Sequence, residues 1–259
     1  MTSSDSVKTR RGLSIGMKLT LAAGGAALMT GLAVGAVALL RADAQTEARA
    51  ESSLRNAAYT AAHRVEQLLD AIDNDLAFLR RSELGTDDFE DFLNPWATDA
   101  DAVTQLYGAG NPRPMDERQT LEDAGDGSDW SDAHSRHHRT YYGFQEGSGY
   151  YDLFLISLEG EVVYSVTKQD DFGQNLTNGP LAGSGLARAY EAALKLQPGQ
   201  SVVIDFSPYA PSGGAPAAFA ATRAYSHDGA PLGVLALEIS SEDIDAILRS
   251  LETGEGERV

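Results

Sequence analysis

The sequence predicts an α+β domain with an antiparallel sheet, preceded by an apolar N-terminal segment and a long helix. Three features carry this prediction. Residues 19–40 include no charged side chain, residues 41–81 include neither proline nor glycine, and residues 150–239 alternate short apolar runs with turn residues. A chain of 259 residues with 42% hydrophobic residues can bury a substantial core.

The 22 uncharged residues at positions 19–40 are enough to cross a bilayer as a transmembrane helix. At about 1.5 Å per residue they cover roughly 30 Å, the thickness of the hydrocarbon core. Basic residues precede them, namely Lys8, Arg10, Arg11 and Lys18. The positive-inside bias therefore predicts residues 1–18 in the cytoplasm and the following domain in the periplasm. A cleaved signal peptide ending near Ala42-Asp43-Ala44 is the alternative, and it exports the domain as well.

Residues 41–83 are predicted to form one long amphipathic helix. Apolar residues recur there in steps of three and four, at Leu54, Ala58, Ala61, Val65, Leu68, Ile72, Leu76 and Leu79. We expect part of this stripe to pack on the domain and the membrane-proximal part to pair with a second copy, giving a homodimer. The glycine- and aspartate-rich segment 84–91 is expected to end the helix.

Residues 84–251 are predicted to form the folded domain. Its first part, 95–149, reads as a long functional loop with a short strand near 103–107 and a helical turn around 130–145. The rest predicts a hairpin, a helix capped by Ser184, three further strands and a last helix, at 150–157, 161–167, 184–196, 201–206, 216–225, 231–239 and 241–251. This order predicts an antiparallel sheet with its helices on one side.

The composition excludes several classes of function. Lys and Arg number 20 against 38 Asp and Glu, a net charge of −18 that repels nucleic-acid backbones. No nucleic-acid partner is therefore expected, and cationic or neutral ligands are weakly favoured. Because the chain has no cysteine, disulfides, thiolate metal sites and a cysteine nucleophile are excluded.

No motif assembles a catalytic site or a cofactor site. Asp171-Phe172-Gly173 is the metal-binding triplet of protein kinases, but the other kinase segments are missing. Serine stands in no G-x-S-x-G, and no phosphate-binding G-x-x-x-x-G-K is present. We therefore predict a protein that is not an enzyme and needs no cofactor.

The cluster His134-x-x-His137-His138 leaves three interpretations open. On a helix, His134 and His137 or His138 share a face, and Asp129 or Asp132 could add oxygen ligands for a metal. The cluster lacks the H-E-x-x-H spacing of metallohydrolases, so we predict no metal and retain a hydrolase only as an alternative. The other two interpretations are structural hydrogen bonding and contact with a ligand.

The residues are better suited to capturing a small molecule. An amino acid or organic acid needs one fixed cation, one fixed anion and apolar or aromatic walls. Lys168 ends a predicted strand, and Asp171 follows three residues later, although the two could equally form a weak surface ion pair. The candidate ligand-binding residues are Lys168, Asp171, Phe172, Tyr209, His134, His138 and Tyr142.

Several longer stretches carry a family resemblance. QLYGAGNPRP (105–114), DAGDGSDWSDAHSRHH (123–138), GYYDLFLISLEGEVVYSVTKQDDFGQNLTNGP (149–180) and DFSPYAPSGGAPAAFAA (205–221) resemble the extracytoplasmic sensor region of bacterial methyl-accepting chemotaxis proteins. The resemblance spans about residues 105–250 and implies a Cache-like, PAS-related sensor fold. Gln169 stands where the family usually has glutamate, which puts any role of that acid in doubt.

The resemblance implies that the chain is the periplasmic ligand-sensing portion of an inner-membrane chemoreceptor. Residues 252–259 are expected to be the start of a longer continuation, and this N-terminal fragment is expected to lack the rest of it. Alternatives are the input domain of a sensor histidine kinase or nucleotide cyclase, or an exported binding protein without output.

Overall fold

The computed structural model describes residues 51–241 of the chain. The chain divides into two compact units, residues 1–60 and 61–259. Residues 51–60 of the first unit are helical, and so are residues 61–79 at the start of the second. The expected cytoplasmic tail (1–18), transmembrane helix (19–40), final helix beyond Ser241 and continuation (252–259) lie outside the described residues. Within residues 51–241 no helix is long and apolar enough to span a membrane.

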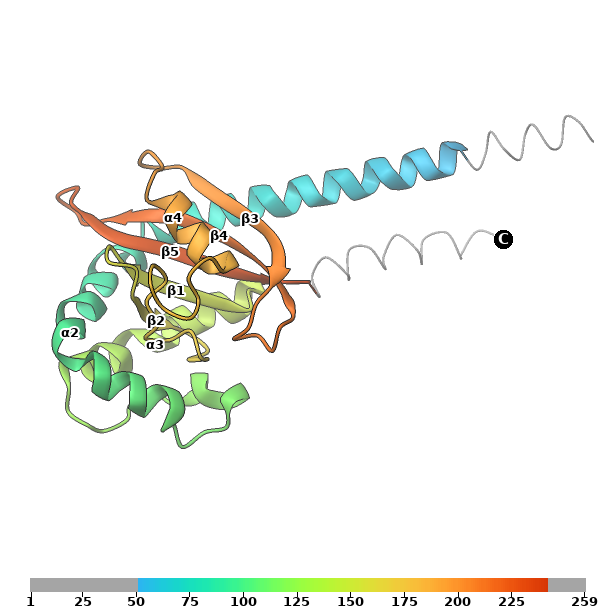
Figure 1. The fold of residues 1–259 in the computed structure, drawn as a ribbon. Helices are drawn as coiled ribbons and strands as arrows, with labels where there is room; N and C mark the ends of the chain where they lie inside the picture. The colour runs from blue at the N-terminus through green and yellow to red at the C-terminus, as the bar shows by residue number, and fades with distance from the viewer. Residues whose placement is uncertain (1–50, 242–259) are drawn as a thin grey trace, which may run out of the picture. The chain divides into compact units, whose positions relative to one another are not determined.

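The second unit is built on a five-stranded antiparallel sheet, so the predicted α+β class is confirmed (Figure 1). The strands follow the order β2-β1-β5-β4-β3. Their bounds are β1 Asp152–Ser157, β2 Val162–Ser165, β3 Ser201–Pro208, β4 Pro216–Tyr225 and β5 Pro231–Ser240. All five match predicted strands to within a few residues. The hairpin turn falls at Gly160, whose φ of +88° and close approach to Thr177 and Tyr190 leave little room for a side chain.

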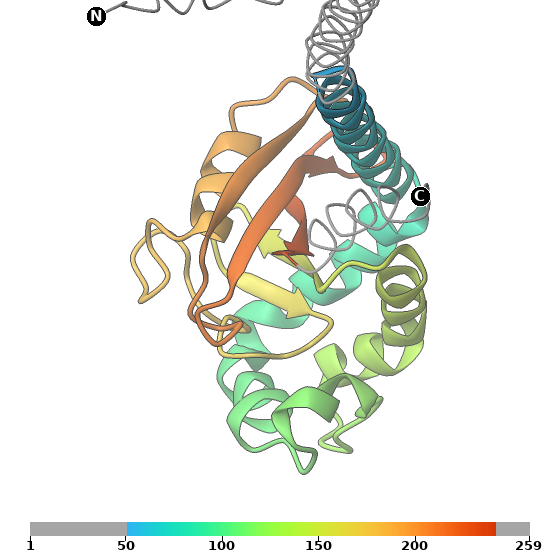
Figure 2. The same ribbon diagram turned by 90° about the vertical axis from the view of Figure 1, so that its right-hand side faces the viewer.

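Helices cover both faces of the sheet, so the prediction of helices on one side is wrong (Figure 2). Helix α4 (Gly185–Ala193) lies on one face, with Ser184 capping its start by accepting from Ala187 N at 3.2 Å. Helices α2 and α3 and residues 72–84 pack on the other face. The cause is visible in β1, where Phe154 and Leu155 are both buried, each on a different face.

Helix α2 (Asp87–Thr104) replaces the predicted loop and the predicted strand near 103–107, both of which are wrong. Pro95 lies inside α2, where a proline locally disfavours a helix. Phe89, Phe92 and Trp96 are nevertheless buried on one side of α2. Burying each such side chain gains about 1.5–3 kcal/mol, which together exceeds the ~3 kcal/mol cost of an internal proline.

Helix α3 (Asp129–Ser148) is longer than the predicted helical turn, and it leaves little of 95–149 as loop. Its first turn is capped by Ser128 Oγ, which accepts from Ser131 N at 3.1 Å. Its end is marked by Gly149 at φ +78°. Two short helical segments, η2 (Gln105–Ala109) and η3 (Met115–Thr120), connect α2 to α3.

The helical residues before α2 end at position 79, followed by a single turn, η1 (Glu83–Gly85). Ile72, Leu76 and Leu79 are buried in the core, as the apolar stripe predicts for intrachain packing. Leu54 and Val65 are 69% and 40% exposed in the single chain. Pairing with a second copy through this exposed part stays a prediction.

Candidate functional site

A series of rings runs along one side of α3 at intervals of four residues. Trp130 stacks on His134 with centroids 5.1 Å apart, and His134 stacks on His138 at 4.2 Å. Tyr142 continues the series at 6.1 Å from His138. Trp130, His134 and His138 are buried, whereas Tyr142 is only partly buried. The series therefore leads from the core to the surface.

His138 is held as a neutral imidazole of one defined tautomer. Its Nε2 lies 2.6 Å from the carbonyl oxygen of Gln119, which can only accept, so Nε2 carries the proton. Its Nδ1, 2.7 Å from the Tyr164 hydroxyl, then accepts. Burial, with the nearby charge of Lys168, lowers the pKa of His138 to about 3.

His134 is neutral for the same reasons. Its Nδ1 donates to the carbonyl oxygen of Glu122 at 2.8 Å, and its Nε2 has no partner among the described residues. Burial and the charge of Lys168 lower its pKa well below the ordinary value. A neutral, buried imidazole is well suited to packing and to accepting a hydrogen bond.

His137 points away from this series, to Asp88 Oδ1 at 3.2 Å and Asp91 Oδ2 at 2.9 Å. It therefore shares no site with His134 and His138. In the described part of the chain, no group of three or more His, Asp or Glu side chains is placed to hold a metal ion. The metal interpretation of the histidine cluster thus gains no support.

Lys168 is fully buried, which excludes the surface ion pair considered from the sequence. Its ammonium donates to the carbonyl oxygens of Ser165 and Val166, and it lies 4.3 Å from the centroid of the Tyr164 ring. Burial lowers the pKa of Lys168 to about 7, against the opposing charge of Asp152. Its φ of +55° is rare for a residue with a side chain, a strain typical of functional positions.

Asp171 is also fully buried, and within residues 51–241 it forms no ion pair with Lys168. Its Oδ2 accepts from the Tyr209 hydroxyl at 2.9 Å, while its Oδ1 has no partner in the described part. Burial, together with the charge of Asp152, raises the pKa of Asp171 to about 8. Phe172 packs 5.6 Å from Trp130. The D-F-G segment is therefore part of the core.

Two further buried carboxyl groups were missed from the sequence. Asp152 accepts from Ser165 Oγ at 2.7 Å and from Val166 N at 2.9 Å, and burial raises its pKa. Glu238, its partner across the β1–β5 pair, accepts from Ser212 Oγ at 2.6 Å, and burial raises its pKa too. The sequence signal that could have revealed them is an acidic residue within an otherwise apolar strand, Asp152 in β1 and Glu238 in β5.

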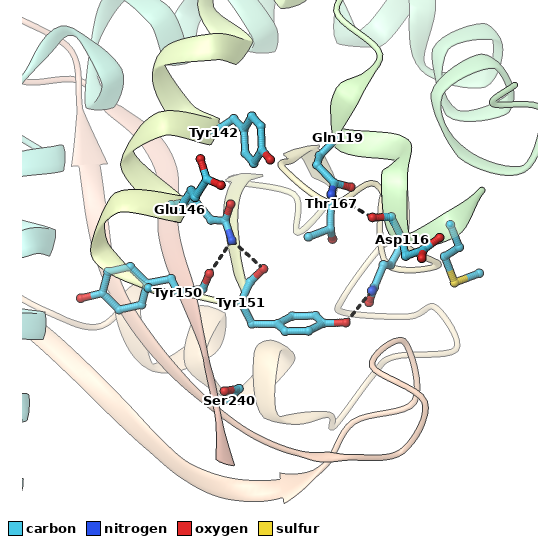
Figure 3. Close-up of a pocket in the computed structure, with 12 residues that line it drawn as sticks. Asp116, Gln119, Tyr142, Glu146, Tyr150, Tyr151, Thr167 and Ser240 are labelled. Carbon is cyan, nitrogen blue, oxygen red and sulfur yellow. Dashed lines mark hydrogen bonds between the residues drawn. The ribbon is translucent and has the colours of Figure 1, made fainter. Parts of the chain in front are cut away.

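A cleft of about 700 Å³ opens at the surface end of the ring series (Figure 3). It lies between η3, the C-terminal part of α3, the start of β1 and the segment after β2. Its described lining is Met115, Asp116, Gln119, Tyr142, Gln145, Glu146, Gly149, Tyr150, Tyr151, Thr167, Gln169 and Ser240. The volume suits a small organic molecule.

Of the candidate residues from the sequence, Tyr142 alone lines this cleft among the described residues. Lys168 lies directly between the lining residues Thr167 and Gln169, and His138 stacks on Tyr142. His134, Asp171, Phe172 and Tyr209 lie deeper in the core. Tyr151, Gln145 and Glu146 were not anticipated, although the recurrence of ring residues every fourth position through α3 pointed to this end of the helix.

The cleft is joined to the helical residues before α2. Tyr150 lines it, and the Tyr150 hydroxyl donates to Asp75 Oδ2 at 2.8 Å. One turn further, Phe78 stacks on Phe144 of α3 at 5.9 Å. Tyr150 and Phe144 therefore provide direct contacts between the region of the cleft and residues 72–79.

Comparison with known proteins returned no matching family model and no matching curated protein. Similar solved structures exist. One is the sensor domain of the V. cholerae histidine kinase DctB, at 14% identity and TM-score 0.43, with 76% of this chain and 57% of that chain covered.

Two others are ligand-binding domains of chemoreceptors. Campylobacter jejuni Tlp3, in complex with 4-methylisoleucine, shares 14% identity at TM-score 0.35, over 69% of this chain and 62% of that one. Pseudomonas fluorescens CtaA, in complex with L-serine, shares 17% sequence identity at TM-score 0.31, with 68% of this chain and 63% of that chain covered. The chain thus spans less than two thirds of each of these three proteins.

These TM-scores lie below 0.5, and such likenesses say nothing of what this chain binds. The three similar structures are a sensor domain of a histidine kinase and ligand-binding domains of two chemoreceptors.

Proposed function

We propose that this chain is the ligand-sensing portion of a membrane receptor of the chemoreceptor type. A small molecule occupies the cleft at Tyr142, and its binding is transmitted to the helical residues 61–79. The domain lies outside the inner membrane, anchored by residues 19–40, and works as a homodimer. The resemblance of residues 105–250 to chemoreceptor sensor regions supports this class of protein.

The observation that carries the proposal is the position of Tyr150. This residue lines the cleft, while its ring points away from the cleft (Figure 3) and its hydroxyl donates a hydrogen bond to Asp75, so one residue connects the cleft to the helix. A ligand that contacts Tyr150 or its neighbour Tyr151 changes the packing of that helix only if it prefers one of two arrangements. The Tyr150–Asp75 hydrogen bond is the contact through which such a preference acts.

The buried groups have a supporting role in this proposal. Lys168 and His138 are the deep neighbours of the cleft, reached through Thr167, Gln169 and Tyr142. His134 and Phe172 both pack on Trp130 on this face of the sheet, whereas Tyr209, which donates to Asp171, packs in the core on the opposite face. Binding is favoured over catalysis because His134 and His138 are neutral and buried, and so are poorly placed to exchange protons with a substrate in the cleft.

A thermal-shift screen of the full chain against amino acids, organic acids and amines tests the proposal. A ligand at 100 times its dissociation constant stabilises the protein by about 2.7 kcal/mol. We expect Tyr142→Ala and Tyr151→Ala to abolish the shift, whereas Tyr59→Ala, outside the cleft, keeps it. A ligand whose shift survives both cleft substitutions would place the binding site elsewhere.

The same cleft would serve the input domain of a histidine kinase or a nucleotide cyclase. Swimming assays separate these outputs. A chemoreceptor changes the swimming bias of cells within seconds of ligand addition, and Tyr142→Ala removes that response while receptor abundance stays unchanged.

A further inference from the structure

We propose that the cleft selects a cationic ligand, an organic amine with an apolar or aromatic body. This inference rests on the proposed function, because it names the class of molecule that the same cleft takes. It follows from the chemical character of the lining groups.

The first observation is the charge of the lining. Asp116 and Glu146 line opposite sides of the cleft, which Tyr142 and Tyr151 also line (Figure 3). Neither carboxylate forms an ion pair with a described residue, and no Lys or Arg is among the described lining residues. An anion in this position would meet two like charges, whereas a cation would meet two opposite ones.

The second observation is the orientation of three glutamines. Gln145 Nε2 donates to the carbonyl oxygens of Tyr150 and Tyr151, and Gln119 Nε2 donates to that of Asp116 at 2.9 Å. Because a carbonyl only accepts, these bonds fix which end of each amide is the nitrogen. Gln145 thereby uses both of its N–H groups within the protein and Gln119 uses one of its two, while the side-chain oxygen of each amide is left for a ligand.

Gln169 continues this pattern. Its Nε2 bonds to the Tyr151 hydroxyl at 2.7 Å, and its Oε1 is buried without a hydrogen-bond partner in the described part. A buried acceptor without a donor is costly, so a shift of the Gln169 side chain that lets a ligand N–H reach this oxygen is favoured. The cleft as a whole offers acceptors and ring faces, and an ammonium group attached to an apolar body complements both.

Three matched probes test the selectivity: 2-phenylethylamine, 2-phenylethanol and 3-phenylpropionate. They share a phenyl ring and differ in being a cation, a neutral alcohol and an anion at pH 7. Isothermal titration of the full 259-residue chain at low and high salt measures each affinity. We expect the amine to bind at least tenfold more tightly than the alcohol, and the acid to bind weakest.

Substitutions then assign the preference to the cleft. Asp116→Asn and Glu146→Gln each weaken amine binding about threefold to fivefold, as expected for an exposed charge pair, and leave binding of the alcohol unchanged. Glu117→Gln is the matched control, because Glu117 neighbours Asp116 in η3 but does not line the cleft. All three acids are exposed, so the variants are expected to fold.

The outcomes separate this inference from the proposed function. If the alcohol or the acid binds as tightly as the amine, the inference is overturned while a ligand site remains. If none of the three binds at millimolar concentration, or if Glu117→Gln weakens the amine as much as Asp116→Asn, the inference fails as well. The thermal-shift screen with Tyr142→Ala and Tyr151→Ala tests the proposed function independently of this inference.

Discussion

The two halves of α3 present the same stripe of side chains to very different surroundings. In the N-terminal half, Trp130 and His134 are fully buried, and the Trp130 indole donates to the carbonyl oxygen of Val163 at 3.1 Å. In the C-terminal half, Tyr142 and Glu146 line an open cleft. The first half holds the domain together, and in the proposed function the second half contacts the ligand. On that proposal, stability and recognition are separated along one helix.

The largest expected effect is a loss of stability on substitution in the buried N-terminal half of α3. Trp130→Ala removes the largest buried side chain of the stripe and should lower the free energy of unfolding by about 3–5 kcal/mol. Tyr142→Ala, at the other end, should cost about 1 kcal/mol or less, because its ring is only partly buried. Urea denaturation followed by circular dichroism measures both. Equal costs at the two positions would contradict the division of roles.

The next effect concerns the buried acid beside the stripe. Burial raises the pKa of Asp171 to about 8, so between pH 4 and pH 8 the folded protein holds a proton that the unfolded chain releases. Its contribution to stability is therefore complete near pH 4 and is lost as the pH rises through 8. Wild type should lose stability relative to Asp171→Asn over this window, by an amount on the order of a few kcal/mol.

Denaturation at several pH values checks this expectation. Asp170→Asn is the control, because Asp170 is the exposed neighbour of Asp171. Its stability relative to wild type should not change in this way with pH. A wild-type profile parallel to that of Asp171→Asn would show that the Asp171 carboxyl titrates normally.

A smaller effect tests the connection from the cleft to the helix. Tyr150→Phe removes one hydrogen bond to Asp75 and should cost about 1 kcal/mol of stability. The ring remains, so ligand affinity should change less than twofold. Asp75→Asn should act in the same direction as Tyr150→Phe. If either substitution abolishes ligand binding, the bond belongs to the binding site itself.

The smallest expected effect is a change in ligand affinity at the cleft beside the C-terminal half of α3. Gln169→Glu replaces a neutral acceptor of the cleft by a carboxylate, which should strengthen binding of 2-phenylethylamine by about threefold. Glu159→Gln, remote from this cleft, serves as a charge control. Weaker amine binding in Gln169→Glu would mean that the amide nitrogen, and not its oxygen, faces the ligand.

The sheet could be predicted from the sequence because its strands are short apolar runs bounded by turn residues. Gly160 and Ser184 each mark an element end through a local requirement of the backbone. Helix α2 could not be predicted in the same way. Its stability comes from burying Phe89 and Phe92 against segments distant in sequence, and this tertiary packing outweighs the local signal of Pro95.

The candidate site was only partly accessible from the sequence. Tyr142 lines the cleft, whereas Lys168 and Asp171 are fully buried and are not among its described lining residues. A sequence shows that charged residues lie near each other along the chain. It does not show that both side chains turn into the core, where Asp171 accepts from Tyr209 and Lys168 lies over the Tyr164 ring. Whether a ligand contacts these residues stays a prediction.

Hydrogen exchange measured by mass spectrometry tests most directly whether occupancy of the cleft reaches the helix. The full chain is compared with and without a saturating ligand identified in the screen, in wild type and in Tyr150→Phe. We predict that the ligand changes amide protection in residues 142–151 of both proteins, and in residues 61–79 of wild type only. Protection changes confined to the cleft in wild type, or unchanged coupling in Tyr150→Phe, would contradict transmission through this hydrogen bond.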